Sequence, residues 1–563
     1  MRDASVNQEL DKLAGDYWDY VLSTSPTSAL LLGDHRYDQE MEQFSRQAED
    51  EQIERISGFA AAASAIPDGG LTADERITKQ VLIEEATGHA NELRSRTAEF
   101  DVSPSWGFHI ELPQFAGQFP LTERAHAEAL VVKWSKVGHT IDQLIHRLRQ
   151  GVARDRTPPI SSVEKSIVQI DQYLATPITD DPFVTVPAPP SFTHDQIEAW
   201  RDQLVRQVVD VIRPAYERYH HELVAAVAPM ARPGEKAGVR WLADGEEVYA
   251  RAIRRYTSLD LTPLEIHNIG LEEIARLEDE YQEMGKAVLG TTDLAEIYDR
   301  LRNDPDLRFA DGEQVVTAAQ EAMDRARAAI PDWFGRLPRA DCVMAEIPEQ
   351  AAKDSPIAYY LPPATDGSRP GTYFINTTEP TTRTRFESEV LAFHESIPGH
   401  HLQIAIAQEL EGIPEFRKHA LMTVYVEGWG LYTERLADEM GLYSTPLTRM
   451  GMLSFDSWRA GRLVVDTGMH ALGWSKQEAI DYLVANSPLA LNNIESEIER
   501  YIGMPGQALA YMIGRREIMR LRGQAEKSLG DRFDIRGFHD VVLGSGPVPL
   551  GVLGDLVSGW AGF

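Results

Sequence analysis

Histidine and carboxylate side chains gather in one short stretch of this chain, and their types suit a metal ion. His394, Glu395, His400 and His401 lie within eight residues, and Glu427 follows in the sequence Val-Glu-Gly-Trp-Gly. Two imidazoles and a carboxylate form a ligand set that is typical of zinc. A further glutamate beside the first histidine can take a proton from a metal-bound water. The set therefore predicts a metal-dependent hydrolase, with His394 as a ligand and Glu395 as the general base.

The path of the backbone decides which histidines can share an ion. In the usual zinc-peptidase motif two histidines lie four residues apart on one helix face, but Pro398 occupies that position here. An uninterrupted helix would turn His400 away from His394 and bring His401 round instead. Pro398 and Gly399 favour a kink or bulge, which would return His400 to the place of the second ligand. We therefore favour His400, and keep His401 as the alternative ligand or as a residue that hydrogen-bonds the site.

Glu427 is the expected third ligand. Glycines on either side of Trp429 follow it directly and leave room for a neighbouring helix or an ion. Glu434 lies seven residues later on the same helix face and is the competing choice. Three protein ligands leave one position for water, as a catalytic zinc site needs. The expected cofactor is therefore one Zn²⁺ ion held by His394, His400 and Glu427.

Other polar residues have types that suit the hydrolysis of an amide. The oxyanion that forms needs a hydrogen-bond donor besides the metal, and Tyr511, His470 and Tyr501 are the candidates. A packed tyrosine or a satisfied core histidine is an equally good interpretation of these residues. Arg500 or Arg515 can bind a substrate carboxylate through a bidentate pair, although surface pairing is the default for an arginine.

A small sheet is expected immediately before the metal-binding helix, because β-branched and aromatic residues concentrate there. An edge strand beside that helix would hold an extended peptide through main-chain hydrogen bonds, or the sheet would simply brace the helix. Tyr373 and Asn376 of the last strand, with Arg500 and Tyr501, are the expected substrate contacts. The expected strands are 342–344, 357–361 and 372–376.

Most of the remaining chain is expected to be helical. Capping sequences recur along it, followed by apolar residues with a period near 3.6. The 563 residues exceed a single ordinary core, yet no Gly/Ser-rich or Pro-rich linker divides them. We expect one continuous unit, in which a helical region 1–335 walls the cleft and 336–563 forms the catalytic region. The expected N-caps are Thr72, Ser161, Thr193, Thr262, Asp293 and Ser475.

Taken together, these segments resemble the DUF885 family. Its signature H-E-x-x-P-G-H-H-x-Q is similar to residues 394–403, and further similar boxes extend over most of the chain, from 25–37 to 500–511. The resemblance implies a distant relationship to the gluzincin metallopeptidases. It also implies a mainly α-helical, zincin-like fold with a deep channel, and it favours His400 as the ligand and the sheet as a substrate-binding element. Met512 is a departure, since relatives often carry lysine there.

The composition bears on partners and location. The net charge is −32, from 87 acidic and 55 basic residues, and such a surface repels nucleic acid and anionic membranes. The single cysteine, Cys342, permits neither an intrachain disulfide nor a cysteine metal site, and it is expected as a buried residue of a strand. Residues 1–9 lack an apolar signal core, and no stretch is long and apolar enough to span a bilayer. The expected location is therefore the cytoplasm.

The expected function is hydrolysis of a peptide or other amide bond in short peptides or small amides. The limit on size follows only from the resemblance to helical gluzincins. Two alternatives remain at this point. The same ligand set binds non-haem iron for oxygen chemistry, although Glu395 argues against that use. A non-catalytic helical scaffold would instead hold a structural metal, closed by a fourth ligand such as His401.

Overall fold

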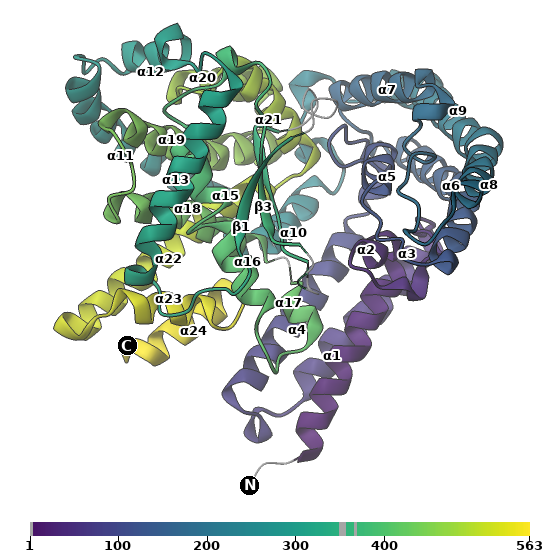
Figure 1. Ribbon diagram of the computed structural model, residues 1–563, viewed down its shortest axis with the longest axis horizontal. Coiled ribbons are helices and arrows are strands. Elements are labelled where there is room, and N and C mark those ends of the chain that lie inside the picture. The colour runs from purple at the N-terminus through teal and green to yellow at the C-terminus, as the bar shows by residue number, and fades with distance from the viewer. Residues whose placement is uncertain (1–3, 348–355, 365–366, 368, 421) are drawn as a thin grey trace.

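The computed structural model describes residues 4–347, 356–364, 367, 369–420 and 422–563. The protein is mainly helical with one small sheet, as predicted (Figure 1). None of the helices in the described part of the chain is long and apolar enough to cross a membrane. The helices before the sheet are α1 (Ala4–Thr24), α2 (Pro26–Leu31), α3 (Arg46–Ala65), α4 (Ala73–Arg94), α5 (Phe108–Ala116), α6 (Arg124–Val152), α7 (Ile160–Ala175), α8 (His194–Gln207), α9 (Arg213–Glu222), α10 (Gly245–Thr257), α11 (Pro263–Val288), α12 (Leu294–Asn303) and α13 (Gly312–Trp333).

Most of the predicted helix starts are confirmed. Ser161 is the exception, because α7 begins at Ile160 after Pro159. Its hydroxyl instead donates a hydrogen bond of 3.0 Å to Glu499 in the later helix α21 (Leu491–Gly503). Complete capping boxes form at Thr72, Thr193, Thr262 and Ser475, and the Asp293 side chain caps α12.

The sheet has the strand order β1-β3-β2. The central strand β3 (Gly371–Ile375) pairs in parallel with β1 (Cys342–Glu346) and antiparallel with β2 (Ala358–Leu361). Each strand lies within two residues of its predicted position, and Cys342 is buried in β1 as expected. Because β2 is at the edge and contacts helix α15 (Ser388–Glu395), an edge strand does lie beside the predicted metal-binding helix.

Three hydrophobic clusters organise the helices. One lies between Leu30 and Val227 and is enclosed largely by α5–α9, which form one side of the molecule (Figure 1). The largest includes residues from Leu10 to Ala561, so the main core crosses residue 335 and both expected regions contribute to it. A small third cluster joins residues 237 and 465–508.

The helices that follow the sheet carry the candidate site. Two of them, α18 (Thr423–Glu439) and α22 (Ala510–Leu529), cross so closely that a Cβ atom on Gly428 would lie 2.5 Å from the Cα atom of Gly514. This confirms that a glycine directly after Glu427 leaves room for a neighbouring helix. These helices are α15, α16 (His400–Gln408), α17 (Glu415–Lys418), α18 (Thr423–Glu439), α19 (Pro446–Thr467), α20 (Lys476–Asn486), α21, α22 (Ala510–Leu529), α23 (Ile535–Leu543) and α24 (Leu550–Ala561).

Candidate metal centre

The chain breaks completely between the two histidine-bearing helices. Helix α15 ends at Glu395 and α16 begins at His400, with Gly399 as its N-cap. The sequence predicted a kink or bulge within one helix, whereas the structure has two helices. The return is so tight that a Cβ atom on Gly399 would lie 1.9 Å from the carbonyl oxygen of His394. Only glycine fits at this position without moving the backbone.

The segment between the helices is held by α18. The indole nitrogen of Trp429 donates a hydrogen bond of 3.0 Å to the carbonyl oxygen of Pro398. Gly430, one residue later, lies against the ring of His394, and a Cβ atom there would come within 2.7 Å of Cε1. The Glu-Gly-Trp-Gly sequence therefore fixes the break and makes space for the first imidazole, next to the carboxylate of Glu427.

His394, His400 and Glu427 come together as predicted, with potential ligand atoms all within 4.8 Å of one another. Nε2 of His394 lies 3.6 Å, and Nε2 of His400 3.5 Å, from Oε2 of Glu427. Two atoms that bind one tetrahedral zinc at ~2.1 Å lie about 3.4 Å apart. The three residues thus have the separations of ligands around a single ion.

The unpaired atoms of this group also fit a cation. Oε2 of Glu427 is buried and has no hydrogen-bond partner among the described residues, since the two imidazole nitrogens are too far away. Burial acts to raise the pKa of Glu427, but the His394 and His400 rings outweigh it and hold that pKa well below its usual range. A buried ionised carboxylate that faces two imidazole nitrogens is a suitable site for a divalent cation.

Glu434, the competing third ligand, lies behind His394 instead. Its Oε1 accepts a hydrogen bond of 2.8 Å from Nδ1 of His394, so in the neutral ring the lone pair is on Nε2, which faces Glu427. Burial disfavours the charged imidazole, but Glu427 and Glu434 outweigh it and raise the pKa of His394 to about 9. A carboxylate on the far nitrogen of a histidine is the usual support of a zinc ligand.

His401 faces away from the other two histidines. Its Nε2 donates to the carbonyl oxygen of Ala340 at 3.1 Å, and its Nδ1 accepts from the hydroxyl of Tyr360 in β2 at 2.9 Å. Gly371 makes space for this pair, because a Cβ atom there would lie 2.5 Å from Nδ1. Both ring nitrogens are therefore used to attach α16 to the sheet, and neither is left for a metal.

Glu395, the expected base, ends α15 next to His394 and is half-buried. Tyr373 of β3 lies near it with a fully buried hydroxyl that has no hydrogen-bond partner among the described residues. Burial and the charge of Glu395 raise the pKa of Tyr373 well above its usual value, so its hydroxyl keeps its proton. Tyr373 is thus a donor close to the base, whereas its burial leaves little surface for a substrate.

Tyr511 belongs to α22 and is half-buried. Burial and the neighbouring charge of Glu427 raise the pKa of its hydroxyl. The guanidinium carbon of Arg462 is 4.3 Å from the centre of its ring. Tyr511 therefore offers a protonated hydroxyl beside the centre, as an oxyanion donor must.

The other predicted catalytic residue, His470, does not join the site. Its Nδ1 accepts a hydrogen bond from the backbone of Val239, and its Nε2 donates to the carbonyl oxygen of Tyr501. Burial lowers its pKa to about 4, so the ring is neutral. This corrects its expected catalytic role, because both nitrogens already bind the backbone of the core.

The expected substrate contacts are also engaged within the protein. The hydroxyl of Tyr501 accepts from Trp458 and Arg462 and donates to Glu497, and it is buried. The side chain of Asn376 holds the loop after β3, with its oxygen accepting from Thr378. The two arginines complete the set. Arg500 binds Glu497 and Gln507, and Arg515 binds Asp456 and Glu273.

Arg459 and Arg462 of α19 were not among the predicted residues, although they lie close to the centre. Nη2 of Arg459 is 3.8 Å from the Glu434 oxygen that supports His394. The sequence gives one indication, which is a pair of arginines three residues apart in a helix otherwise rich in apolar, aromatic and small residues. Such a charge in a buried helix needs a partner.

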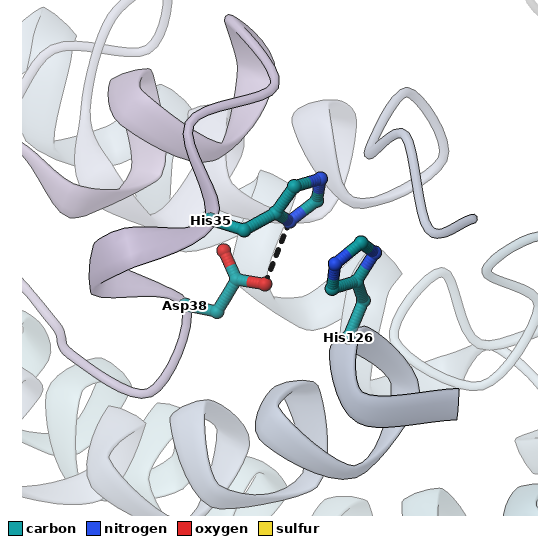
Figure 2. Close-up of side chains that lie close together, drawn as sticks. All are labelled: His35, Asp38 and His126. Carbon is teal, nitrogen blue, oxygen red and sulfur yellow. Dashed lines mark hydrogen bonds and ion pairs between the residues drawn. The ribbon is translucent and has the colours of Figure 1, made fainter. Parts of the chain in front are cut away.

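A second group of potential ligands lies in the N-terminal part of the chain, where His35, Asp38 and His126 meet (Figure 2). Nδ1 of His35 and Oδ2 of Asp38 are 2.8 Å apart, a hydrogen-bond distance. The two imidazole rings stack with centres 3.4 Å apart and planes 5° apart. An ion midway between the two rings would lie about 1.7 Å from each ring plane, which is half the spacing of the rings. The lone pairs of the nitrogens lie within the ring planes and would not point at such an ion. This group therefore suits a zinc ion less well than His394, His400 and Glu427.

Comparisons with known proteins agree with this architecture. The family model described as "Bacterial protein of unknown function (DUF885)" matches residues 26–557. A crystal structure described as "the putative lipoprotein from Colwellia psychrerythraea" is 27% identical, covers 99% of both chains and superposes with a TM-score of 0.91. A protein from Shewanella oneidensis, described as a "putative lipoprotein of unknown function", is 17% identical over 97% of this chain and 99% of its own, with a TM-score of 0.77, and shares the fold. A comparison with curated proteins gave no match.

Proposed function

This chain belongs to the DUF885 family of bacterial proteins of unknown function, and we propose that it is a zinc-dependent hydrolase of peptide or other amide bonds. One observation carries the proposal. Two imidazole nitrogens, from His394 and His400, face a single buried oxygen of Glu427 at 3.6 and 3.5 Å, and this oxygen has no hydrogen-bond partner in the described part of the chain. Bound there, Zn²⁺ would supply a Lewis acid and lower the pKa of a coordinated water.

The protein's own residues then divide the work of hydrolysis. Glu395 accepts the proton of the attacking water on a carboxylate oxygen and returns it to the nitrogen of the leaving amine. Tyr511, whose raised pKa keeps its hydroxyl protonated, donates a hydrogen bond to the oxygen of the attacked carbonyl. Glu434 holds His394 in one tautomer and one orientation.

The surroundings favour an extended substrate of limited size. The edge strand β2 contacts α15, which ends in the proposed base. Among the described residues no further strand pairs with the outer edge of β2, and we propose that a peptide backbone pairs there. In our proposal this arrangement corresponds to a zincin-like site, reached by a channel between the helical regions before and after the sheet. Short peptides and small amides are therefore the proposed substrates.

The two alternatives predict different results. A structural metal needs a fourth protein ligand, but within the described residues the group has three members, and both nitrogens of His401 are engaged elsewhere. An iron enzyme would retain iron when purified without added metal, so elemental analysis of that protein distinguishes it from a zinc enzyme. The cytoplasmic location stays a proposal, and the names of the two solved relatives describe lipoproteins.

The decisive test is Glu395→Gln. We expect this variant to bind zinc as the unmodified protein does and to lose at least about a hundredfold in kcat on a panel of short peptides with free and blocked termini. Glu415→Gln, at an exposed glutamate of α17, is the control and should keep full activity. Full activity of Glu395→Gln would remove the assigned base, and a protein without metal and without turnover would remove the proposed function.

A further inference from the structure

One wall of the candidate metal centre carries three arginines, which outnumber the carboxylates that form ion pairs with them. Arg459, Arg462 and Arg500 lie together there, whereas the only carboxylates paired with them among the described residues are Glu434 and Glu497. Glu434 is already engaged by His394. This surplus lies within a protein whose net charge is −32, so it is a local feature rather than a consequence of composition.

Arg459 is the least satisfied of the three. It is 4% exposed, and its Nε and Nη1 atoms are buried with no hydrogen-bond partner among the residues that the structure describes. Its nearest carboxylate oxygen, on Glu434, is 3.8 Å from Nη2, beyond hydrogen-bond distance. The rings of Phe455 and Trp458 both have their centres 4.2 Å from its guanidinium carbon. The aromatic rings thus hold the cation in place while the donors at its edge stay unused.

Arg462 is held more firmly and also has a donor to spare. Its Nε donates to the hydroxyl of Tyr501 at 2.7 Å and its Nη2 to Glu497 at 3.0 Å. Its Nη1 is buried and has no partner within the described part of the chain. The guanidinium carbon is 4.3 Å from the ring centres of both Trp458 and Tyr511. The guanidinium group of Arg462 is therefore fixed in orientation, and its Nη1 atom is left to bind a ligand.

Arg459 and Arg462 lie next to the candidate metal centre. Arg459 lies near Glu434, which supports His394. Arg462 stacks on Tyr511, and the charge of Glu427 raises the pKa of the Tyr511 hydroxyl. Tyr511 and Trp458 are only half-buried, so the wall they form has an accessible rim. A group bound by the two arginines would therefore belong to a molecule that also reaches the metal ligands.

We propose that Arg459 and Arg462 bind a carboxylate of the substrate, which in a short peptide is its free C-terminus. Buried donors without partners destabilise a protein. Their presence beside the proposed catalytic centre therefore points to a ligand that accepts their hydrogen bonds. Paired guanidinium groups match the planar, two-oxygen geometry of a carboxylate. This inference rests on the proposed function, and it names the substrate class as peptides with a free carboxylate near the bond that is cleaved.

The test compares three tripeptides in calorimetric titrations of the zinc-loaded Glu395→Gln protein, in which turnover does not interfere. The probes are Ala-Ala-Ala, its C-terminal amide and the amide of Ala-Ala-Glu. We expect the free acid to bind about 10- to 100-fold more tightly than its amide, the effect of a charge-assisted pair. Tighter binding of the Ala-Ala-Glu amide than of the Ala-Ala-Ala amide would support a carboxylate site filled from a side chain. Equal binding of all three would overturn the inference.

Variants then assign the effect to the two arginines. Arg459→Lys and Arg462→Lys keep the charge but lose the fork, and each should reduce the preference for the acid about 10-fold. Arg232→Lys is the matched control, because Arg232 is also buried and its Nε and Nη1 atoms likewise have no hydrogen-bond partner within the described residues. The preference of this variant for the acid should stay unchanged. An unchanged preference in both site variants would overturn the assignment.

Failure of this inference differs from failure of the proposed function. If the unmodified protein hydrolyses the acid and the amide equally well, the hydrolase stands and the carboxylate site falls. If no peptide is hydrolysed but the acid binds more tightly than the amide, the carboxylate site stands and the hydrolase falls. Should Arg459→Lys not fold, the comparison of acid with amide on the intact site still decides the inference.

Discussion

The two adjacent histidines of α16 allow the metal site to be tested with a matched pair of substitutions. His400 and His401 are both buried, at 9% and 1% exposure, and differ in direction. His400 points its Nε2 at Glu427, whereas His401 binds Tyr360 and Ala340. Replacing each by alanine removes the same ring from neighbouring positions, so any difference between the variants reports the direction of the ring.

The expected magnitudes follow from these contacts. Structural zinc sites with four protein ligands bind the ion with ~10–16 kcal/mol, or about 3 kcal/mol for each ligand. If His400 contributes a similar amount, His400→Ala should weaken zinc binding roughly a hundredfold. His401→Ala should leave zinc affinity almost unchanged. It removes two buried hydrogen bonds, worth together about 1–3 kcal/mol of folding free energy, and should lower the thermal unfolding midpoint.

Competition with a chromogenic chelator measures the zinc affinity, and circular dichroism during heating measures the unfolding midpoint. His400→Ala should have the lower zinc affinity of the two variants, because it loses a metal ligand. His401→Ala should have the lower unfolding midpoint, because it loses stability. Loss of zinc from His401→Ala with retention in His400→Ala would refute the assignment. That result would mean that the backbone continues through Pro398 as one helix.

Three further predictions test the support of the site and the buried histidines. Glu434→Gln should weaken zinc binding about 10- to 100-fold in the same competition assay while the protein still folds, and unchanged affinity would show that His394 needs no carboxylate behind it. Gly430→Ala should also weaken zinc binding, because the new Cβ atom would lie 2.7 Å from the ring of His394, whereas Gly58→Ala, with nothing within 4 Å, should not. Burial lowers the pKa of His109 and His470 to about 4 and that of His539 to about 3, below the unfolded value near 6.5. Between these values each of these rings binds more protons in the unfolded chain than in the folded one, so each lowers the thermal unfolding midpoint as the pH drops from about 6.5 towards 4. Removing one ring, as in His539→Gln, should therefore make the midpoint less dependent on pH over this range, and an unchanged pH dependence would contradict the neutral state of that ring.

Local sequence was sufficient where the cause of a structure lies within a few residues. The strands before α15 and most of the helix starts follow from such patterns, because a capping box or a β-branched run acts over one turn. The approach of His400 to His394 was also predictable, since proline and glycine at 398 and 399 cannot continue a helix. The extent of the break could not be predicted, because it depends on a hydrogen bond from Trp429 to the carbonyl oxygen of Pro398, 31 residues earlier in the chain.

Residues with distant partners could not be placed in this way. His470 has glycine and aspartate neighbours typical of an active site, yet its partners are backbone groups of Val239 and Tyr501. Arg500 and Arg515 are arginines in the right region, but each finds carboxylates from other turns or helices. Sequence gives the type of such a side chain, whereas its role depends on which atoms remain unpaired after folding.

Whether the atoms of a charged side chain are paired after folding distinguishes structural from functional charges within this one protein. Arg515 and Arg435 share Asp456, and further pairs with Glu273 and Glu280 complete them, so these ion pairs join α11, α18, α19 and α22 into one support. Arg459 lies in the same helix as Asp456, but its buried Nε and Nη1 atoms, like Oε2 of Glu427, have no hydrogen-bond partner among the described residues. Burial without a partner is costly, and next to the candidate metal centre a bound ligand would offset that cost. The unused acceptor fits a cation and the unused donors fit an anion, and a peptide carboxylate is an anion whose neighbouring amide can reach that cation.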